Sequence, residues 1–173
     1  MAKRTLKRRR REGRTDYKLR LGLLKSGLPR IVIRRTNKYF IVQAVESNEA
    51  QDKIVMTVSS KELLKNGWNE KRIGSLKSIP AGYLTGFLFA KQIKKQVAGR
   101  RSQVADKYIV DLGMARTING ARVFAVVKGL VDGGLDISVD EKAFPSEERL
   151  MGEHLKDDVK NVIIKVREKM KND

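Results

Sequence analysis

The sequence predicts an α/β fold: a mixed sheet of about five strands with helices on its faces, a basic N-terminal arm and a C-terminal helical extension. Three observations predict this class. Three short runs rich in β-branched residues lie between residues 30 and 59, separated by polar turns. Two apolar segments with helical spacing then alternate with two strand-like runs, and a last helical stripe begins near residue 146. The resulting order, β-β-β-α-β-α-β, requires a parallel connection and therefore a mixed sheet.

Local signals set the bounds of each predicted element. Thr15 or Asp16 is suited to cap the first helix, and Gly27 is suited to end it. The Asn37-Lys38 pair predicts a tight turn between the first two strands. The predicted elements are, in chain order, a helix over 15–27, strands over 30–36, 39–46 and 53–59, a short helix over 60–65, a helix over 79–98, a strand over 107–112, a helix over 120–130, a strand over 136–139 and a helix over 146–171. They form three parts: the arm and short helix over 1–28, a core domain over 29–140 and an extension over 141–173.

Positive charge is concentrated at the start of the chain. The 173 residues contain 38 Lys and Arg against 20 Asp and Glu, a formal net charge of +18. Residues 1–38 hold 15 of the basic and 2 of the acidic side chains, so the rest of the chain is close to balance. Residues 1–14 cannot bury an apolar surface and are predicted to be disordered in isolation. Because such an excess opposes compaction unless a polyanion neutralises it, the predicted partner is nucleic acid, with an anionic membrane surface as the alternative.

Composition also excludes several classes of site. The chain has no cysteine, which excludes disulfides, thiolate metal sites and a cysteine nucleophile, and which fits a reducing cytoplasm. No apolar run approaches the roughly 18 residues that a membrane span needs, and the basic N-terminus has no apolar signal core. We therefore expect a cytoplasmic protein without a membrane partner.

The basic run at 7–11 is the sharpest functional signal. Arginine holds phosphate with two hydrogen bonds and stacks on bases, so an arm richer in Arg than in Lys favours folded RNA over the alternatives, a DNA-binding or merely solvated tail. The turn at 34–39 places cations, an amide and an aromatic ring at one tip, which suits looped RNA, although Tyr39 packed on the sheet is the alternative. Cations at 100–101 follow a helix and are equally explained by its dipole. The predicted RNA-binding side chains are Lys3, Arg4, Lys7, Arg8, Arg9, Arg10, Arg11, Arg14, Tyr17, Arg20, Arg30, Arg34, Arg35, Asn37, Lys38, Tyr39, Arg100 and Arg101.

Catalysis has little support in the sequence. The one histidine, His154, falls in the predicted terminal helix without an obvious partner. The strand order is similar to that of ribonuclease H-like nucleases, which gather carboxylates on their sheet for metal ions, and Asp111 sits suitably on the fourth strand. The first strand, however, offers arginine where such an enzyme needs an acid. Gly82 and Gly86 lie four apart and predict close helix packing rather than a nucleotide loop. We expect no catalytic residue, no metal site and no cofactor.

Several segments together resemble a known family. The start, RRRREGRTDYKLRLGLLKSGLPRIVIRRTNKY, resembles the archaeal large-subunit ribosomal proteins numbered eighteen, which bind 5S ribosomal RNA. Further matches are the GW pair at 67–68, PAGYLTG at 80–86 and DLGMARTINGARVFAVVKGLVDGGLDI at 111–137. The resemblance covers almost the whole chain, and its length and extra terminal helix are similar to the archaeal form rather than to the shorter bacterial one.

The resemblance implies a function. It implies a structural constituent of the large ribosomal subunit that contacts 5S rRNA, large-subunit rRNA and neighbouring ribosomal proteins in the central protuberance, with no small-molecule substrate. The RNA contacts would fall on the arm, on the tip at 34–39 and on parts of the loop after the long helix. The alternatives are a DNA-compacting protein and, least favoured, the nuclease considered above.

Overall fold

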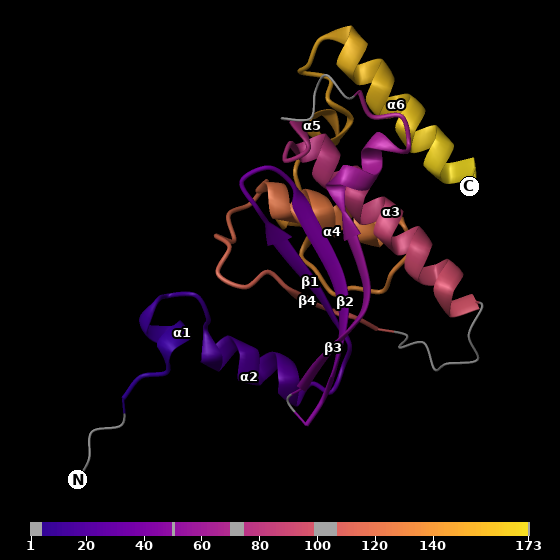
Figure 1. The fold of residues 1–173 in the computed structure, drawn as a ribbon. Helices are drawn as coiled ribbons and strands as arrows, with labels where there is room; N and C mark the ends of the chain where they lie inside the picture. Colours follow the sequence, from indigo (N-terminus) through magenta and orange to yellow (C-terminus); the bar gives the residue numbers. More distant parts are fainter. Residues whose placement is uncertain (1–4, 50, 70–74, 99–106, 173) are drawn as a thin grey trace.

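The computed structural model describes residues 5–49, 51–69, 75–98 and 107–172. Its centre is a four-stranded sheet in the order β3-β2-β1-β4 (Figure 1). β1 pairs antiparallel with β2 and parallel with β4, so the predicted mixed α/β sheet is confirmed. The strands are β1 (Arg30–Arg35), β2 (Phe40–Asn48), β3 (Gln51–Ser59) and β4 (Ile109–Asp111).

The first hairpin turns where the Asn37-Lys38 pair predicts it. Arg35 lies opposite Phe40 as the last pair of the ladder. Thr36 closes the turn, because its backbone N–H donates to the carbonyl of Tyr39 at 2.9 Å and its hydroxyl oxygen accepts the N–H of Tyr39 at 3.0 Å. Asn37 and Lys38 are thereby left at an exposed tip.

The second hairpin is longer than predicted. The two strands are predicted to end at residue 46 and to begin at residue 53, but β2 continues to Asn48 and β3 begins at Gln51. Ser47 lies opposite Asp52, and the Ser47 hydroxyl donates to the Asp52 carboxylate at 2.7 Å. Cross-strand polar pairs of this kind stabilise the end of the ladder, where both strands are exposed. The predicted short helix then follows as the 3-10 helix η1 (Ser60–Leu64).

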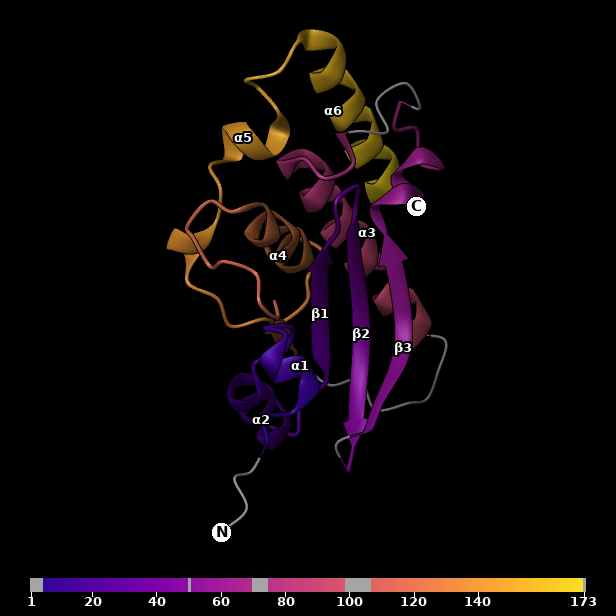
Figure 2. The same cartoon turned by 60° about the vertical axis from the view of Figure 1, so that its left-hand side comes forward.

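Two helices, α3 (Ile79–Ala98) and α4 (Arg122–Asp132), cover one face of the sheet (Figure 2). The bounds of α3 agree with the prediction, and α4 begins and ends two residues later than predicted. Alternate side chains of β1, β2 and β3 point at these helices, as the two-residue period of a strand requires. They form a first core cluster that includes Ile31, Ile33, Phe40, Val42, Met56, Val58, Phe89, Val126 and Leu130.

α3 and α4 meet backbone against backbone, which confirms the close packing predicted from Gly86. A Cβ atom at Gly86 would lie 2.1 Å from the carbonyl oxygen of Val126, and one at Gly129 would lie 2.1 Å from the carbonyl oxygen of Tyr83. Gly82 has more room, since its nearest neighbour would be the ring of Phe40 at 3.2 Å. The two contacts at 2.1 Å involve backbone, so a side chain at either glycine forces the helices apart.

We therefore expect Gly86→Ala to lower the free energy of unfolding by about 3 kcal/mol, the upper part of the range for an overpacked core. Gly22→Ala is the matched control, because Gly22 is also helical and nothing lies within 4 Å of the added Cβ. That control is expected to be neutral or stabilising by up to about 1 kcal/mol. Urea unfolding of both variants tests this, and equal stabilities would contradict the close approach.

The predicted fifth strand over 136–139 is wrong. Ile137 makes one isolated parallel bridge with Tyr108, and the Tyr108 N–H donates to the carbonyl of Asp136 at 3.0 Å. No further ladder forms because Asp140 caps the 3-10 helix η3 (Glu141–Ala143), which follows at once. The sheet therefore has four strands in the described part of the chain.

The C-terminal extension contains two helices where one is predicted over 146–171. α5 (Glu147–Met151) ends at Gly152, and α6 (Asp157–Asn172) follows. Gly152 has a φ of +75°, the left-handed conformation that glycine adopts without strain at a helix end. A Cβ there would lie 2.7 Å from Cδ1 of Ile163, so the packing of α6 also favours glycine. His154 lies in the connection rather than in a helix.

The terminal helix packs on this domain, a point that the sequence leaves open between this domain and a neighbour. The apolar stripe of α6 joins a second core cluster together with side chains of α3 and the loop after η1. Members of this cluster include Trp68, Tyr83, Leu84, Leu150, Val159, Ile163, Val166 and Met170.

Among the helices of the described ranges, none has the length and apolar character needed to cross a membrane.

Candidate nucleic-acid interface

The short helices α1 (Arg8–Arg11) and α2 (Tyr17–Lys25) lie at the opposite end of the molecule from α5 and α6 (Figures 1 and 2). Between them and the sheet lies a groove of about 810 Å³. We call it the arm groove. Its lining residues are Arg9, Arg14, Thr15, Asp16, Tyr17, Leu19, Arg20, Leu23, Arg34, Arg35, Asp111, Leu112, Gly113, Met114 and Ala115. Five arginines and several apolar side chains thus share one hollow.

α2 forms by local capping rather than by burial. The Asp16 carboxylate accepts the backbone N–H groups of Lys18 and Leu19 at 2.9 and 3.1 Å, as a helix N-cap does. No residue of α2 is buried, and Leu19 and Leu21 are 46% and 54% exposed. A nine-residue helix is marginal in water without packing, so α2 presents an apolar surface that is still available to a partner.

α1 is a single turn within the stretch predicted to be disordered in isolation. Glu12 pairs with Arg8 at 3.7 Å and with Arg14 at 3.3 Å, and Arg9 Nε donates to the hydroxyl of Thr15 at 2.9 Å. All these side chains are exposed except that of Thr15, which is half-buried, so each pair contributes little to stability. The turn bends the basic run back toward the arm groove.

A chain of ion pairs ties α2 to the sheet. Arg20 of α2 pairs with Asp52 of β3 at 2.9 Å, and Asp52 pairs with Arg30 of β1 at 2.5 Å. Arg30 also pairs with Asp111 of β4 at 3.4 Å, and Asp111 pairs with Arg34 at 3.0 Å. The two carboxylates therefore join three arginines from two elements, and they fix Arg34 beside the arm groove.

The pKa of Asp52 shows that this network favours the ionised carboxylate. Partial burial acts to raise the pKa of Asp52, but hydrogen bonds from Ser47, Arg20 and Arg30, together with the charge of Arg30, outweigh it and hold the pKa below its ordinary value. Stability from this group is present above its unfolded pKa and is lost only as the pH falls through the lowered folded pKa. The network is therefore intact at neutral pH.

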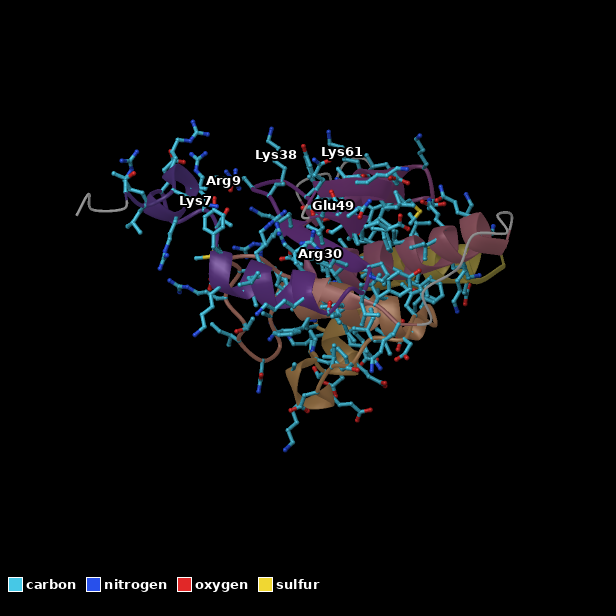
Figure 3. All side chains as sticks on the ribbon, turned by 90° about the horizontal axis from the view of Figure 1, so that it is seen from below. Lys7, Arg9, Arg30, Lys38, Glu49 and Lys61 are labelled. Atoms are coloured by element: carbon cyan, nitrogen blue, oxygen red, sulfur yellow. The ribbon has the colours of Figure 1, made fainter. Side chains whose placement is uncertain are left out.

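Arg30 has a structural role, and we leave it out of the interface although the sequence predicts it as RNA-binding. Its side chain is 2% exposed, since β1 lies between β2 and β4. It donates to Ser47, Asp52 and Asp111. Figure 3 shows Arg30 enclosed by neighbouring side chains, whereas Lys38 points away from the sheet into solvent.

The other side chains predicted to bind RNA are of three kinds: those without a partner in the protein, those that already contact another residue, and those outside the described residues. Among the described residues, Arg10, Arg11 and Arg35 are exposed and their guanidinium groups have no hydrogen bond or ion pair. The ammonium group of Lys7 lies 4.9 Å from the centre of the Tyr17 ring. Lys3, Arg4, Arg100 and Arg101 lie outside the described residues.

The hairpin tip is more mixed than the sequence predicts. Asn37 and Lys38 are exposed at the turn. Tyr39 is half-buried and packs against the second core cluster, as the alternative reading of the turn expects. Its ring is covered by Lys61, whose ammonium group lies 4.6 Å from the ring centre. The tip therefore offers Lys38, Lys61 and an amide, with little aromatic surface free.

Sequence reasoning missed the wall that follows β4. Gly113 and Met114 line the arm groove opposite α2, and Met114 is 59% exposed. One signal was present, because loops that follow parallel strands gather at one edge of a sheet. The role of Asp52 and Asp111 in holding arginines was also missed, since each lies far along the chain from its partners.

The nuclease alternative gains no support from the geometry. Asp111, the one carboxylate that the strand order favours, is engaged with Arg30 and Arg34. Within the described ranges, no three His, Cys, Asp or Glu side chains are grouped so that they could hold a metal ion. Cations already occupy the place beside Asp111 that metal-dependent cleavage would require.

Comparisons with known proteins agree with the resemblance seen in the sequence. The model of the family described as "Ribosomal large subunit proteins 60S L5, and 50S L18" matches residues 3–106 and 96–140. The large ribosomal subunit protein uL18 of Methanoregula boonei is 49% identical over 148 residues, which are 86% of this chain and 79% of that protein. The proteins of the same name from Methanoculleus marisnigri and Korarchaeum cryptofilum are 47% and 44% identical over the same share of this chain, and over 78% and 70% of their own lengths. These archaeal relatives carry the names of ribosomal proteins and not of enzymes. The chain belongs to this family of large-subunit ribosomal proteins, whose place is the ribosome in the cytoplasm.

Proposed function

We propose that this chain binds 5S rRNA and helps attach it to the large-subunit rRNA in the central protuberance, as a structural and non-catalytic component. The observation that carries the proposal is the arm groove, which gathers five arginines on one side of a domain of nearly balanced charge. Family membership supports a ribosomal RNA as the polyanion. Neighbouring ribosomal proteins are the expected further partners.

The free arginines of the arm are suited to phosphate. Arg10, Arg11 and Arg35 keep all their donors, and a guanidinium holds a phosphate with two parallel hydrogen bonds. The exposed lysine Lys38 extends the positive surface along the hairpin tip. The contacts proposed from the described residues are those of Lys7, Arg8, Arg9, Arg10, Arg11, Arg14, Tyr17, Arg20, Arg34, Arg35, Asn37, Lys38 and Tyr39. Contacts by Lys3, Arg4, Arg100 and Arg101 stay predictions.

The proposed division of labour follows from burial. No described residue before Arg30 is buried, whereas both core clusters lie between β1 and α6. The domain is stable through these clusters, and the arm contributes charge and an incompletely packed helix. We propose that the domain sets the register in which the arm meets RNA.

Binding to 5S rRNA is expected to be strong, selective and dependent on salt. If roughly 6–10 phosphates are contacted, the affinity falls by about 10³–10⁵ between 50 and 200 mM salt. Filter binding of the full chain to 5S rRNA and to a DNA duplex of similar length, at equal salt, measures the selectivity. Equal affinity for both would contradict the proposal and favour a DNA-compacting protein. Including magnesium and following the RNA on a denaturing gel tests the nuclease alternative, for which we expect no cleavage.

A further inference from the structure

The guanidinium of Arg34 has used its end-on donors within the protein. Its Nη1 donates to the carbonyl of Ile33 at 2.9 Å and to the carbonyl of Asp111 at 2.7 Å. Its Nη2 donates to the Asp111 carboxylate at 3.0 Å. The side chain is nevertheless 43% exposed and lines the arm groove. The Nη1–Nη2 fork that would grip a phosphate end-on is therefore occupied, while the plane of the group is held in one orientation.

Gly113 covers one face of that plane. A Cβ atom at Gly113 would lie 2.9 Å from Cζ, 3.1 Å from Nη1 and 3.2 Å from Nε of Arg34. Nearly equal distances to three atoms of the planar group mean that Gly113 stands over the face and not at its edge. Because Gly113 covers one face, the exposed part of the Arg34 side chain comprises the opposite face or the Nε–Nη2 edge, where two N–H groups have no partner among the described residues.

The rest of the arm groove suits a base better than a phosphate. Leu19 of α2 and Met114 after β4 line it and are 46% and 59% exposed, and Tyr17 and Leu23 line it too. Apolar side chains gain nothing from a phosphate, but they pack on the faces of a base. The volume, about 810 Å³, lies within the range of about 300–1,000 Å³ found for pockets that bury small ligands.

We propose that the arm groove binds an unpaired RNA nucleotide, whose base stacks on the open face of the Arg34 guanidinium against the apolar wall formed by Leu19 and Met114. Arg35, which is exposed and without a partner among the described residues, adjoins it in the groove for the phosphate. Bases inside a duplex cannot reach such a surface, so the site takes RNA from a loop, bulge or end. This inference rests on the proposed function and makes Arg34 a base-contacting residue rather than a phosphate clamp.

Two matched pairs of variants of the full chain test the inference. Leu19→Ala is compared with Leu21→Ala, since both leucines are exposed on α2 but only Leu19 lines the groove. Arg34→Lys is compared with Arg149→Lys, since each keeps its charge and loses the planar group, and Arg149 is exposed on α5 at the opposite end of the molecule from the arm groove. The probes are a short single-stranded RNA containing 2-aminopurine, whose fluorescence is quenched by stacking, and the same strand in a fully paired duplex.

Leu19→Ala and Arg34→Lys are each expected to weaken binding of the single-stranded probe about tenfold and to reduce the quenching, because a stacked base contributes about this much. Both control variants should stay within about twofold of the wild type, and binding of the duplex should not change. Circular dichroism checks that Arg34→Lys remains folded. If it does not, the comparison of Leu19→Ala with Leu21→Ala alone tests the inference.

Three results would overturn the inference: no quenching by the wild-type protein, equal losses for Leu19→Ala and Leu21→Ala, or equal losses for the single strand and the duplex. The wild-type affinity for 5S rRNA is measured alongside. Tight and selective 5S rRNA binding with any of these results removes the nucleotide site and leaves the proposed function standing. Failure to prefer 5S rRNA over duplex DNA removes the proposed function itself.

Discussion

Deletion of residues 1–14 is expected to lower the affinity for 5S rRNA by about three orders of magnitude at moderate salt while the domain stays folded. The deleted segment carries eight basic side chains and one acidic side chain. Each phosphate contact that is lost removes counterion release, so the slope of log affinity against log salt should also become shallower, by roughly 0.7–0.9 per contact. No described residue of this segment is buried, so the cores are unaffected.

A charge-preserving control separates the effect of the number of positive charges from the effect of the planar guanidinium group. Replacing Arg8, Arg9, Arg10 and Arg11 by lysine keeps every charge but removes the bidentate fork and the stacking plane. We expect this variant to bind more weakly than the wild type and much more tightly than the deletion. Filter binding over a salt series measures all three proteins. An unchanged affinity after the deletion would show that the domain surface carries recognition without the arm.

Asp111→Asn is expected to lower the free energy of unfolding by about 3 kcal/mol, the lower end of the cost of removing one partner from a buried ion pair. Arg30 is 2% exposed and would keep Asp52 but lose its second carboxylate, and Arg34 would lose its ion pair while keeping its hydrogen bond to the backbone carbonyl of residue 111. In a chain of this length the melting temperature should fall by roughly 6–12 °C.

Asp136→Asn provides the control for that measurement. Asp136 is an exposed aspartate on the chain after α4, and its hydrogen bond from Tyr108 uses the backbone carbonyl, which the substitution retains. We expect its stability to remain within about 0.5 kcal/mol of the wild type. Differential scanning calorimetry of both variants tests the difference. If Asp111→Asn and Asp136→Asn have the same melting temperature, the ion-pair network contributes nothing to stability.

The elements that the sequence predicted well are those with a local cause. The turn at Asn37-Lys38 and the bounds of α3 follow from residues within a few positions of each other, so one sequence suffices. The break at Gly152 also has a local signal, but an isolated glycine is tolerated inside a helical pattern and does not by itself predict the end of a helix. The predicted fifth strand is wrong for a different reason. Apolar and polar residues do alternate there, but Asp140 caps the next helix and so ends the pairing after one bridge.

The candidate site was predicted less completely because its geometry is non-local. The two-residue period of β1 shows that Arg30 and Arg34 share a face, but not that Asp52 and Asp111 enclose one of them. Asp52 and Asp111 lie 22 and 81 residues after Arg30 along the chain. The charge distribution of the sequence locates the basic arm. It does not distinguish an arginine that is buried in ion pairs, such as Arg30, from one that is free to bind a partner.

The parallel pairing of β1 with β4 has a consequence for synthesis of the chain. Asp111 leaves the ribosome 81 residues after Arg30, an interval of roughly 4–16 s at about 5–20 residues per second. Asp52 emerges much sooner, so the first three strands can form with Arg30 held by a single carboxylate. Insertion of β4 then brings the second carboxylate, that of Asp111, to Arg30 and at the same time positions Arg34. A nascent chain therefore acquires its groove wall last, after most of its arginines are already exposed to the RNA around them.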